Sequence, residues 1–479
     1  MALRLFLCRC RVASLSLKKT ERGINMTENK QQLLSEMLMS LIENKKYASL
    51  RDAMGTMHAA DIAAVLEECK KEQVPLIFRL LPKELAAETF TQMEEDRQAL
   101  LIQSFSDSEL KAVVDELYVD DAVDLVEEMP ANVVKRILRQ ADPEKRKLIN
   151  EILKYPEDST GSIMTTEYVR LRPDMTVQDA INHIRKTGIN KETINTCYVT
   201  DRNRKILGIV TMRQLLFSEE NTQIREIMTE EVIFALTTED REKVSLDFVK
   251  YDFSAMPVVD EENRLVGIVT IDDVVDVLQE ETTEDIEKMG AIMPLEKPYL
   301  KTSAFEIFKS RIPWLFILMI SAAFTGMIIT RFENALSAQI ALVASIPMLM
   351  GTGGNCGSQS SVTVIRGLSI GEIEFSDILK VLWKEMRVAV LCGIALAVVN
   401  MAKLILLDNL GVMVALVISI TLLLDVIVAK IVGCTLPLIA DKIGLDPAVM
   451  ASPFITTIVD AISLLIYFEI AVLMLGIAV

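Results

Sequence analysis

Histidine is almost missing from this chain of 479 residues, and its cysteines are few and scattered. Only His58 and His183 occur, so the sequence disfavours a metal site built from histidine and a Ser–His–Asp triad. Apart from one Cys-x-Cys at residues 8 and 10, the seven cysteines are far apart, which indicates neither a disulfide framework nor a zinc site. The soluble part also offers no paired base and nucleophile, and we expect no enzyme.

A nucleotide-driven pump is disfavoured as well, because the chain has no G-x-x-x-x-G-K-[ST] loop. The chain is instead rich in acidic side chains. Residues 26–311 hold 55 acidic and 36 basic side chains, whereas residues 312–479 hold 11 and 8. A soluble part with that much negative charge repels nucleic acid and suits cations, although solubility alone would also explain a single acidic patch.

The first 25 residues differ from the rest, being basic with a single acid at Glu21. They resemble a short signal or transit segment. Met26, however, begins a run typical of a cytosolic protein, "MTENKQQLLSEM". We favour an upstream, wrongly assigned start and treat residues 1–25 as a doubtful extension.

Residues 26–158 are predicted to form an acidic helical domain. Short units with apolar residues at helical spacing follow one another, among them "PKELAAETFTQM", "SDSELKAVVDEL" and "PANVVKRILRQ". Many open with an acid or a proline. Such units bury their apolar faces only against their neighbours, which predicts a superhelical stack.

Residues 159–222 and 223–285 contain a duplication. "YVTDRNRKILGIVTMRQLL" is echoed by "PVVDEENRLVGIVTIDDVV". Each copy predicts a strand, a helix, two strands joined by a polar turn, and a second helix. The repeated V-x-D-x-x-x-x-[IL]-x-G-I-V-T resembles a tandem CBS pair, which is a regulatory α/β module.

From residue 312 the chain becomes apolar. Five spans are predicted, at about 312–330, 336–354, 388–407, 411–438 and 453–478, each near the 20 residues that a bilayer requires. Basic residues gather before the first span, between the second and third, and between the fourth and fifth. That bias places the soluble part in the cytosol and the C-terminus outside. Residues 286–311 then connect the two parts.

Asp460 is an acid inside the fifth span. Ionisable groups in a span cost about 2.5–3.5 kcal/mol on insertion scales, so each one needs a reason. Asp460 shares a polar stripe with Ser452, Thr456 and Ser463 and has no basic residue within a helical turn. A stripe that ends in an unpaired acid is what a water-filled cation path requires.

Asp425 in the fourth span is a rival for this role. Lys430 lies five residues later, about 140° round the helix, so the two do not face each other, although Lys430 could pair with an acid on another span. A structural role for Asp425 stays open. Glu469 falls on the face opposite Asp460 and has no assigned role.

The second span ends in "GTGGNCGSQSS". Its glycines permit either backbone unwinding, which would bring carbonyls to a lumen, or close packing between helices. Asn355 and Gln359 add side-chain oxygens. Oxygen ligands without cysteine or histidine indicate a hard cation, and a single aspartate per chain, doubled in a symmetric dimer, suits hydrated Mg²⁺ better than Ca²⁺.

Taken together, the chain resembles the MgtE family of magnesium channels from Met26 to its C-terminus. The resemblance rests on the domain order and on strings such as "GTGGNCGSQS", "GLDPAVMASPFITTIVDAISLLIYF" and "EETTEDIEKMGAI". It implies a multidomain membrane protein with a superhelical α-helical N domain, a tandem CBS pair, a plug helix at about 297–311 within the connecting segment 286–311, and an all-α transmembrane domain of five spans over 312–479. It also implies a homodimer with one central pore lined by the second and fifth spans.

The resemblance assigns residues to two kinds of metal site. In the pore, Asp460 matches the aspartate that binds hydrated Mg²⁺, Asp446 matches an acid near the cytosolic mouth, and Ser452 takes a position where some members carry Asn. Cytosolic Mg²⁺ is expected to bind between the N domain, the CBS pair and the plug, and to hold the pore closed. The matching acids are Glu88, Asp120, Asp124, Asp240, Glu242, Asp252, Asp273, Asp276, Glu281, Glu284 and Asp285.

Some CBS pairs of the family bind ATP, and here Arg213 is followed by Gln214 where such loops often carry Asp, so a nucleotide site is only weakly indicated. The sequence therefore predicts a Mg²⁺ channel in a bacterial inner membrane that admits the ion down the membrane potential. The first alternative is an ion-coupled exporter of divalent cations. The charged residues Asp425, Lys430 and Glu469 would allow such coupling. A CBS-based sensor of Mg²⁺ or nucleotide that transports nothing is the second.

Overall fold

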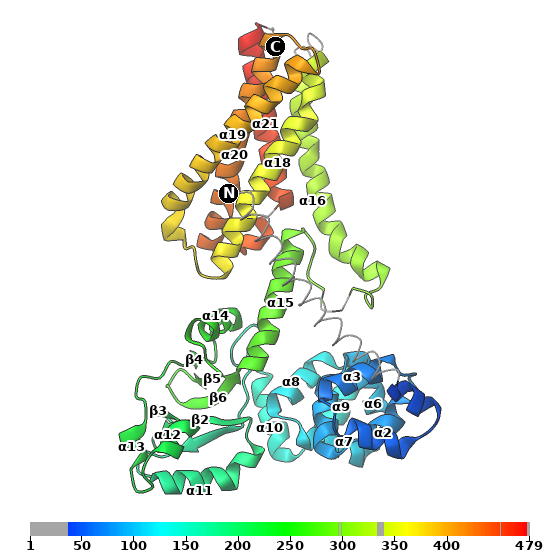
Figure 1. Ribbon diagram of the computed structural model, residues 1–479, viewed down its shortest axis with the longest axis vertical. Coiled ribbons are helices and arrows are strands. Elements are labelled where there is room, and N and C mark those ends of the chain that lie inside the picture. The colour runs from blue at the N-terminus through cyan, green and yellow to red at the C-terminus, as the bar shows by residue number, and fades with distance from the viewer. Residues whose placement is uncertain (1–36, 296, 298, 333–339, 451, 477–479) are drawn as a thin grey trace, which may run out of the picture. The chain divides into compact units, whose positions relative to one another are not determined.

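The computed structural model describes residues 37–479 except 296, 298, 333–339, 451 and 477–479, and only the backbone of Ser452. The proposed extension over residues 1–25 lies outside this range. The chain forms two compact units, Met1–Val274 and Val275–Val479. Figure 1 shows short helices and two small sheets in the first unit and long helices in the second.

The N domain is a chain of short helices, as predicted. A helical stretch over residues 37–43 is followed by α2 (Tyr47–Met54), α3 (Ala59–Glu68), α4 (Val74–Phe78), α5 (Lys83–Thr91), α6 (Glu95–Ser104), α7 (Asp107–Glu116), α8 (Val119–Glu128), α9 (Ala131–Gln140) and α10 (Pro143–Ile152). Helix starts follow the local chemistry: the Ser106 hydroxyl and the Glu109 carboxylate form a capping box on α7, and Asp142 caps α10. Contacts run from α3 to α5, α7 and α9 in turn, which is the expected superhelical stack.

The duplicated segment folds into two similar copies. The first contains β1 (Tyr168–Leu171), α11 (Val177–Thr187), η1 (Gly188–Asn190), β2 (Thr193–Thr200), β3 (Ile206–Thr211) and α12 (Met212–Phe217). The second contains α13 (Ile224–Ile227), β4 (Ala235–Leu236), α14 (Arg241–Tyr251), β5 (Ala255–Val259), β6 (Leu265–Thr270) and α15 (Ile271–Met289). In each sheet the first strand runs parallel to the second, and the third runs antiparallel to it.

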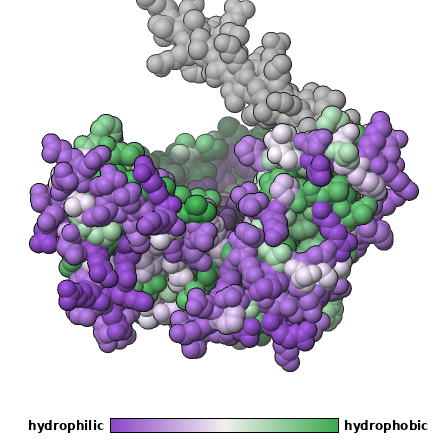
Figure 2. Space-filling view, turned by 90° about the horizontal axis from the view of Figure 1, so that it is seen from below, coloured by the Kyte–Doolittle hydropathy of each residue, from purple (hydrophilic) through white to green (hydrophobic). Residues whose placement is uncertain are grey.

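The repeated motif explains these turns. Asp201 and Asp260, the aspartates of V-x-D, each accept backbone N–H groups of the following turn, at 2.7 Å from Asn203 and 3.0 Å from Glu262. Thr211 and Thr270, which end the two G-I-V-T strings, lie at the starts of the next helices, and Thr211 caps α12. Seen from below, the first unit has a mainly hydrophilic surface, as its acidic composition requires (Figure 2).

The second unit is built from long apolar helices. They are α16 (Ala304–Arg331), α18 (Ile340–Ser369), α19 (Ile378–Leu406), α20 (Val412–Lys442) and α21 (Ser452–Leu475), with short turns η2 (Phe375–Asp377) and η3 (Pro447–Met450) before α19 and α21. By length and composition, five helices of the described residues could cross a membrane. Helix α20 contacts α18, α19 and α21, while α16 contacts α21.

The glycines of α18 serve close packing. The helix continues unbroken from Ile340 to Ser369, so the unwinding that these glycines would allow does not occur. A Cβ built on Gly354 would lie 2.9 Å from the Thr456 side chain, and one on Gly357 would lie 2.9 Å from the Ile455 side chain. Helices α18 and α21 therefore approach at a distance that only glycine permits.

The connecting segment differs from the prediction. The described part of 297–311, which leaves out residue 298, contains no separate plug helix. Instead α15 ends at Met289, and residues 304–311 are the first turns of α16, which continues into the first span. The reason is local: Ser303 and Glu306 form a capping box that begins α16 at Ala304.

Candidate metal centres

Asp460 lies on α21 and is half-buried. Among the described residues, no basic side chain forms an ion pair with it. Two side chains of its predicted polar stripe are already engaged in hydrogen bonds. The Thr456 hydroxyl donates to the Pro453 carbonyl at 2.9 Å, and Ser463 is buried and donates to Asp425. Asp460 is thus an acid on an apolar helix without a neutralising charge, which suits a cation site.

Asn355 and Gln359 are both exposed on α18, one helical turn apart. The close contact of Gly354 with Thr456 brings this part of α18 against the turn of α21 that precedes Asp460. The same two helices therefore carry the candidate pore groups Asn355 and Asp460. The side chain of Ser452, the third predicted pore group, lies outside the described residues.

Asp425 and Lys430 on α20 face different partners, as their spacing predicts. Asp425 is fully buried against α18 and α21. Lys430 is also buried, and its Nζ lies 3.0 Å from the Ser360 hydroxyl and 3.4 Å from the Glu385 carboxylate. Lys430 thus pairs with Glu385 of α19, a pairing with another helix that the sequence left open. Glu469 is exposed on α21.

Asp446 lies in the short segment between α20 and α21. Its Oδ1 accepts the Ala448 N–H at 2.8 Å, and its Oδ2 lies 2.6 Å from Nζ of Lys288. Lys288 also contacts Glu284 at 2.6 Å. Burial alone would lower the pKa of Lys288, but the two carboxylates outweigh it and raise that pKa. One turn earlier, Asp285 accepts the Ser369 hydroxyl at 2.9 Å, and burial raises its pKa.

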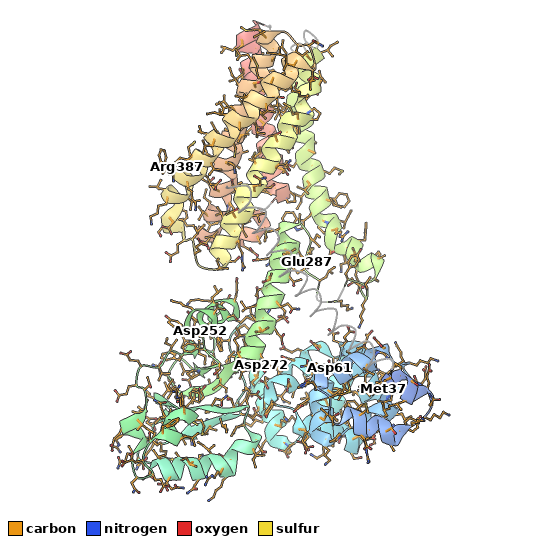
Figure 3. The ribbon with its side chains drawn as sticks, viewed as in Figure 1. Met37, Asp61, Asp252, Asp272, Glu287 and Arg387 are labelled. Atoms are coloured by element: carbon orange, nitrogen blue, oxygen red, sulfur yellow. The ribbon has the colours of Figure 1, made fainter. Side chains whose placement is uncertain are left out.

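The first unit holds a cluster of carboxylates from three segments, which we call the acid cluster: Asp120 and Asp121 of α8, Glu167 and Glu192 of the first CBS copy, and Asp272 and Asp273 at the start of α15. Figure 3 labels one of them, Asp272. Asp120 is buried, and neither its Oδ1 nor Oε2 of Glu192 has a hydrogen-bond partner among the described residues. Two unsatisfied acidic oxygens in one place are costly to bury.

The protonation of this cluster reflects that cost. Burial, with the charge of Asp273 next in importance, raises the pKa of Asp120 well above its usual range. Burial and the nearby charges of Asp272 and Asp273 raise the pKa of Glu192 to about 7. The pKa of Asp273 also rises to about 7, chiefly through burial, although Thr270 donates to it at 2.6 Å. A divalent cation would relieve this repulsion without the need for protons.

Comparisons with known proteins identify the relatives of this chain. The family model MgtE, a divalent cation transporter, matches residues 346–470. The model of the MgtE intracellular N domain matches residues 57–158, and the CBS domain model matches 161–220 and 224–280. The magnesium transporter MgtE of Thermus thermophilus is 34% identical over 446 residues, which cover 92% of this chain and 98% of that protein.

The chain belongs to the MgtE family.

Other relatives extend the match. The magnesium transporter MgtE of Bacillus subtilis is 30% identical over 434 residues, covering 91% of this chain and 96% of its own length. A solved structure of the cytosolic domain of the Mg²⁺ channel MgtE in complex with ATP is 34% identical, with a TM-score of 0.49, and covers 51% of this chain and 99% of its own. The soluble part of a magnesium transporter is 27% identical, also with a TM-score of 0.49, and covers 52% and 99%.

The predicted sensor acids divide into four groups. Asp120 and Asp273 meet in the acid cluster, while Glu284 and Asp285 lie near Asp446 and Ser369 in the second unit. Asp124 of α8 lies beside the acid cluster, since burial of its carboxyl and the charges of Asp273 and Asp121 raise its pKa to about 8. Glu88, Asp252 and Asp276 are exposed. Asp240 caps α14 by accepting from the backbone of Glu242 and Lys243, and Glu242 and Glu281 are half-buried. No three acids, cysteines or histidines of the described residues converge closely enough to hold a metal directly.

Sequence reasoning missed four members of the acid cluster: Asp121 and Asp272, which are neighbours of predicted acids, and Glu167 and Glu192. Glu192 is the least expected of them. It belongs to "KETIN", just before β2, and nothing in that string indicates a ligand. Its position in the acid cluster follows from the register of β1 and β2, since the Glu192 N–H donates to the Glu167 carbonyl at 2.9 Å. Glu167, one residue before β1, was missed for the same reason.

The nucleotide site predicted at Arg213 stays a prediction. Arg213 is exposed on α12. The following Gln214 is used locally: its Oε1 accepts from Thr211 at 2.7 Å, and its Nε2 donates to the Ile227 carbonyl at 3.1 Å. At the position where an aspartate could bind a ligand, this chain has Gln214, which hydrogen-bonds to neighbouring backbone instead.

Proposed function

We propose that this protein is a magnesium channel that admits Mg²⁺ down the membrane potential, with Asp460 holding the hydrated ion. The observation that carries the proposal is the half-buried Asp460 carboxylate on α21, which forms no ion pair with a basic side chain of the described residues. Its full-length relatives are magnesium transporters by name. An inside-negative potential supplies about 2.3 kcal/mol per charge per 100 mV, and twice that for Mg²⁺.

The pore belongs to a homodimer in this proposal. One aspartate per chain supplies one carboxylate, whereas Mg²⁺ that retains its waters is usually held by one or two. Two copies related by a twofold axis would present two Asp460 carboxylates to one ion. The basic residues before α16, between α18 and α19, and after α20 place the first unit in the cytosol and the C-terminus outside.

The test is Mg²⁺ influx into proteoliposomes that contain an indicator dye, for the native chain and for Asp460→Ala. We expect potential-driven influx from the native chain and at least a tenfold loss, or a loss of selectivity, in the variant. Glu469→Ala is the matched control, because Glu469 is an exposed acid on the same helix. Native vesicles without potential-driven influx, even at a Mg²⁺-free cytosolic face, would refute the channel and favour a coupled transporter.

Cytosolic Mg²⁺ also closes the pore in this proposal, by binding at the acid cluster and along α15 with the predicted sensor acids. The acid cluster supports this, because it joins the N domain to both CBS copies through carboxylates that repel one another. Helix α15 begins at the cluster and ends one residue after Lys288, which contacts Asp446 near the mouth of the bundle. Ion binding would favour the compact state by differential affinity.

Limited proteolysis of the full-length protein tests this closure. Cleavage between the N domain and the CBS pair should slow as Mg²⁺ rises into the millimolar range, and Asp120→Asn with Asp273→Asn should remove most of that Mg²⁺ dependence. Glu84→Gln, which removes an exposed acid in the first turn of α5, is the control for a lost surface charge. Cleavage at the same rate at every Mg²⁺ concentration would exclude ion-driven compaction.

A further inference from the structure

Asp425 is the buried acid that the proposed ion path does not use. Its side chain is fully buried on α20, at a depth where an ionisable group is costly. Oδ1 accepts the hydroxyl proton of Ser463 on α21. Oδ2 is buried and has no hydrogen-bond partner among the described residues. Lys430, the nearest base along α20, is held by Ser360 and Glu385 instead.

The same carboxylate lies against the backbone of a third helix. A Cβ built on Gly353 of α18 would lie 2.6 Å from Oδ1 and 2.7 Å from Oδ2 of Asp425. Such distances are too short for a methyl group, so the carboxylate fits only because residue 353 is glycine. One side chain of α20 therefore touches α18 on one side and α21 on the other.

These two contacts lie close to the candidate pore groups. Gly353 is two residues before Asn355, and Ser463 is one helical turn after Asp460. A shift of the Asp425 side chain would move both helices near the residues that face the ion. We propose that Asp425 is a positioning residue, which sets the spacing between the Asn355 segment of α18 and the Asp460 segment of α21.

In this role Asp425 acts through shape and one hydrogen bond and does not bind the ion. The inference rests on the proposed pore between α18 and α21. It predicts that an isosteric side chain without charge serves as well as aspartate, because the amide oxygen of asparagine also accepts from Ser463. Removal of the side chain should instead leave a gap between three helices, into which α18 and α21 relax.

The experiment compares Asp425→Asn and Asp425→Ala in full-length protein, in the same proteoliposome assay and with Ca²⁺ as competing ion. Asp425→Asn should keep the native half-saturating Mg²⁺ concentration and the native preference over Ca²⁺. Asp425→Ala should change one of them about tenfold, within the range for residues that act through their neighbours. The maximal influx per folded dimer is measured separately, so that lost folding is not taken for lost selectivity.

A second pair of variants tests the contact from the other side. Gly353→Ala adds a methyl group against the Asp425 carboxylate and should shift Mg²⁺ affinity or selectivity in the same way. Gly351→Ala, half a turn earlier on α18, meets nothing within 4 Å and should behave as the native chain. Because alanine favours helix more than glycine does, a loss in Gly353→Ala would not be a loss of helix.

Each outcome decides the matter. Native behaviour of both Asp425→Ala and Gly353→Ala would overturn the positioning role. A loss in Asp425→Asn equal to that in Asp425→Ala would also overturn it, since charge would then be required and Asp425 would itself bind a cation. Asp460→Ala distinguishes the two proposals: if that variant conducts like the native chain, the pore assignment fails, whatever the Asp425 variants do.

Discussion

Two lysines of the second unit neutralise acids that lie far from them in the chain or on other helices. Lys288 places an ammonium 2.6 Å from both Glu284 and Asp446, two acids for which the family resemblance predicts contact with Mg²⁺. A tethered cation thus already bridges α15 to the segment between α20 and α21. A metal ion that binds either acid would have to compete with this ammonium or displace it.

Lys430 forms a largely buried ion pair with Glu385 of α19, and Ser360 of α18 bridges the two by donating to Glu385 at 2.6 Å. We predict that Lys430→Met lowers the stability of the detergent-solubilised protein by about 3–5 kcal/mol, because it leaves Glu385 buried without a counter-charge. Thermal unfolding measured by the loss of the monodisperse fraction would show this as a markedly lower midpoint.

The control is the double variant Lys430→Met with Glu385→Gln. Removal of both charges should restore most of the lost stability, since a buried pair is worth little against neutral side chains of similar size. If the double variant were as unstable as the sum of the two single variants, the pair would not be coupled. This result also bears on the exporter alternative, because Lys430 in a neutral ion pair offers no free charge for ion coupling.

At the scale of helices and strands, the sequence was a good guide. The five spans were predicted from apolar length alone, and the two CBS copies from a repeated string whose Asp201 and Asp260 hold equivalent turns. These features depend on neighbours in the chain, so a local pattern contains them. Even the error at the plug was local, because the Ser303–Glu306 capping box that begins α16 is visible in "TSAFEIF".

The candidate sites were less predictable, because they depend on how separate elements are rotated against one another. Asp446 and Lys288 are 158 positions apart, and Asp425 and Ser463 are 38 apart. The polar stripe on the fifth span was read correctly as a stripe. Helical spacing could not tell that Ser463 turns toward Asp425 on α20, while Asp460 stays half-exposed.

At the scale of the whole molecule, the first unit carries a negative charge that folding concentrates. The acid cluster gathers carboxylates from α8, the first CBS copy and α15, and the pKa values of Glu192 and Asp273 rise to about 7. Unfolded carboxyls titrate near 4. Between these values the folded state binds more protons than the unfolded state, so the stability of the compact state falls as the pH rises toward 7.

Because the stability of the compact state falls as the pH rises, cleavage of the full-length protein in EDTA should depend on pH. From pH 5 to pH 8 the N domain should become easier to cleave from the CBS pair, with most of the change below pH 7 and little above it, because the folded state holds protons on Glu192 and Asp273 that the unfolded state has already lost in that window. Millimolar Mg²⁺ should flatten the profile, since a bound cation stabilises the ionised carboxylates.

Glu192→Gln should flatten the pH profile without Mg²⁺ and also lower the Mg²⁺ concentration needed for protection at pH 8. Glu84→Gln, which removes an exposed acid in the first turn of α5, should leave the profile unchanged. Protection from cleavage that increases toward pH 8 in EDTA would mean that the cluster does not oppose the contact between the N domain and the CBS pair, and the sensing role would have to lie elsewhere along α15.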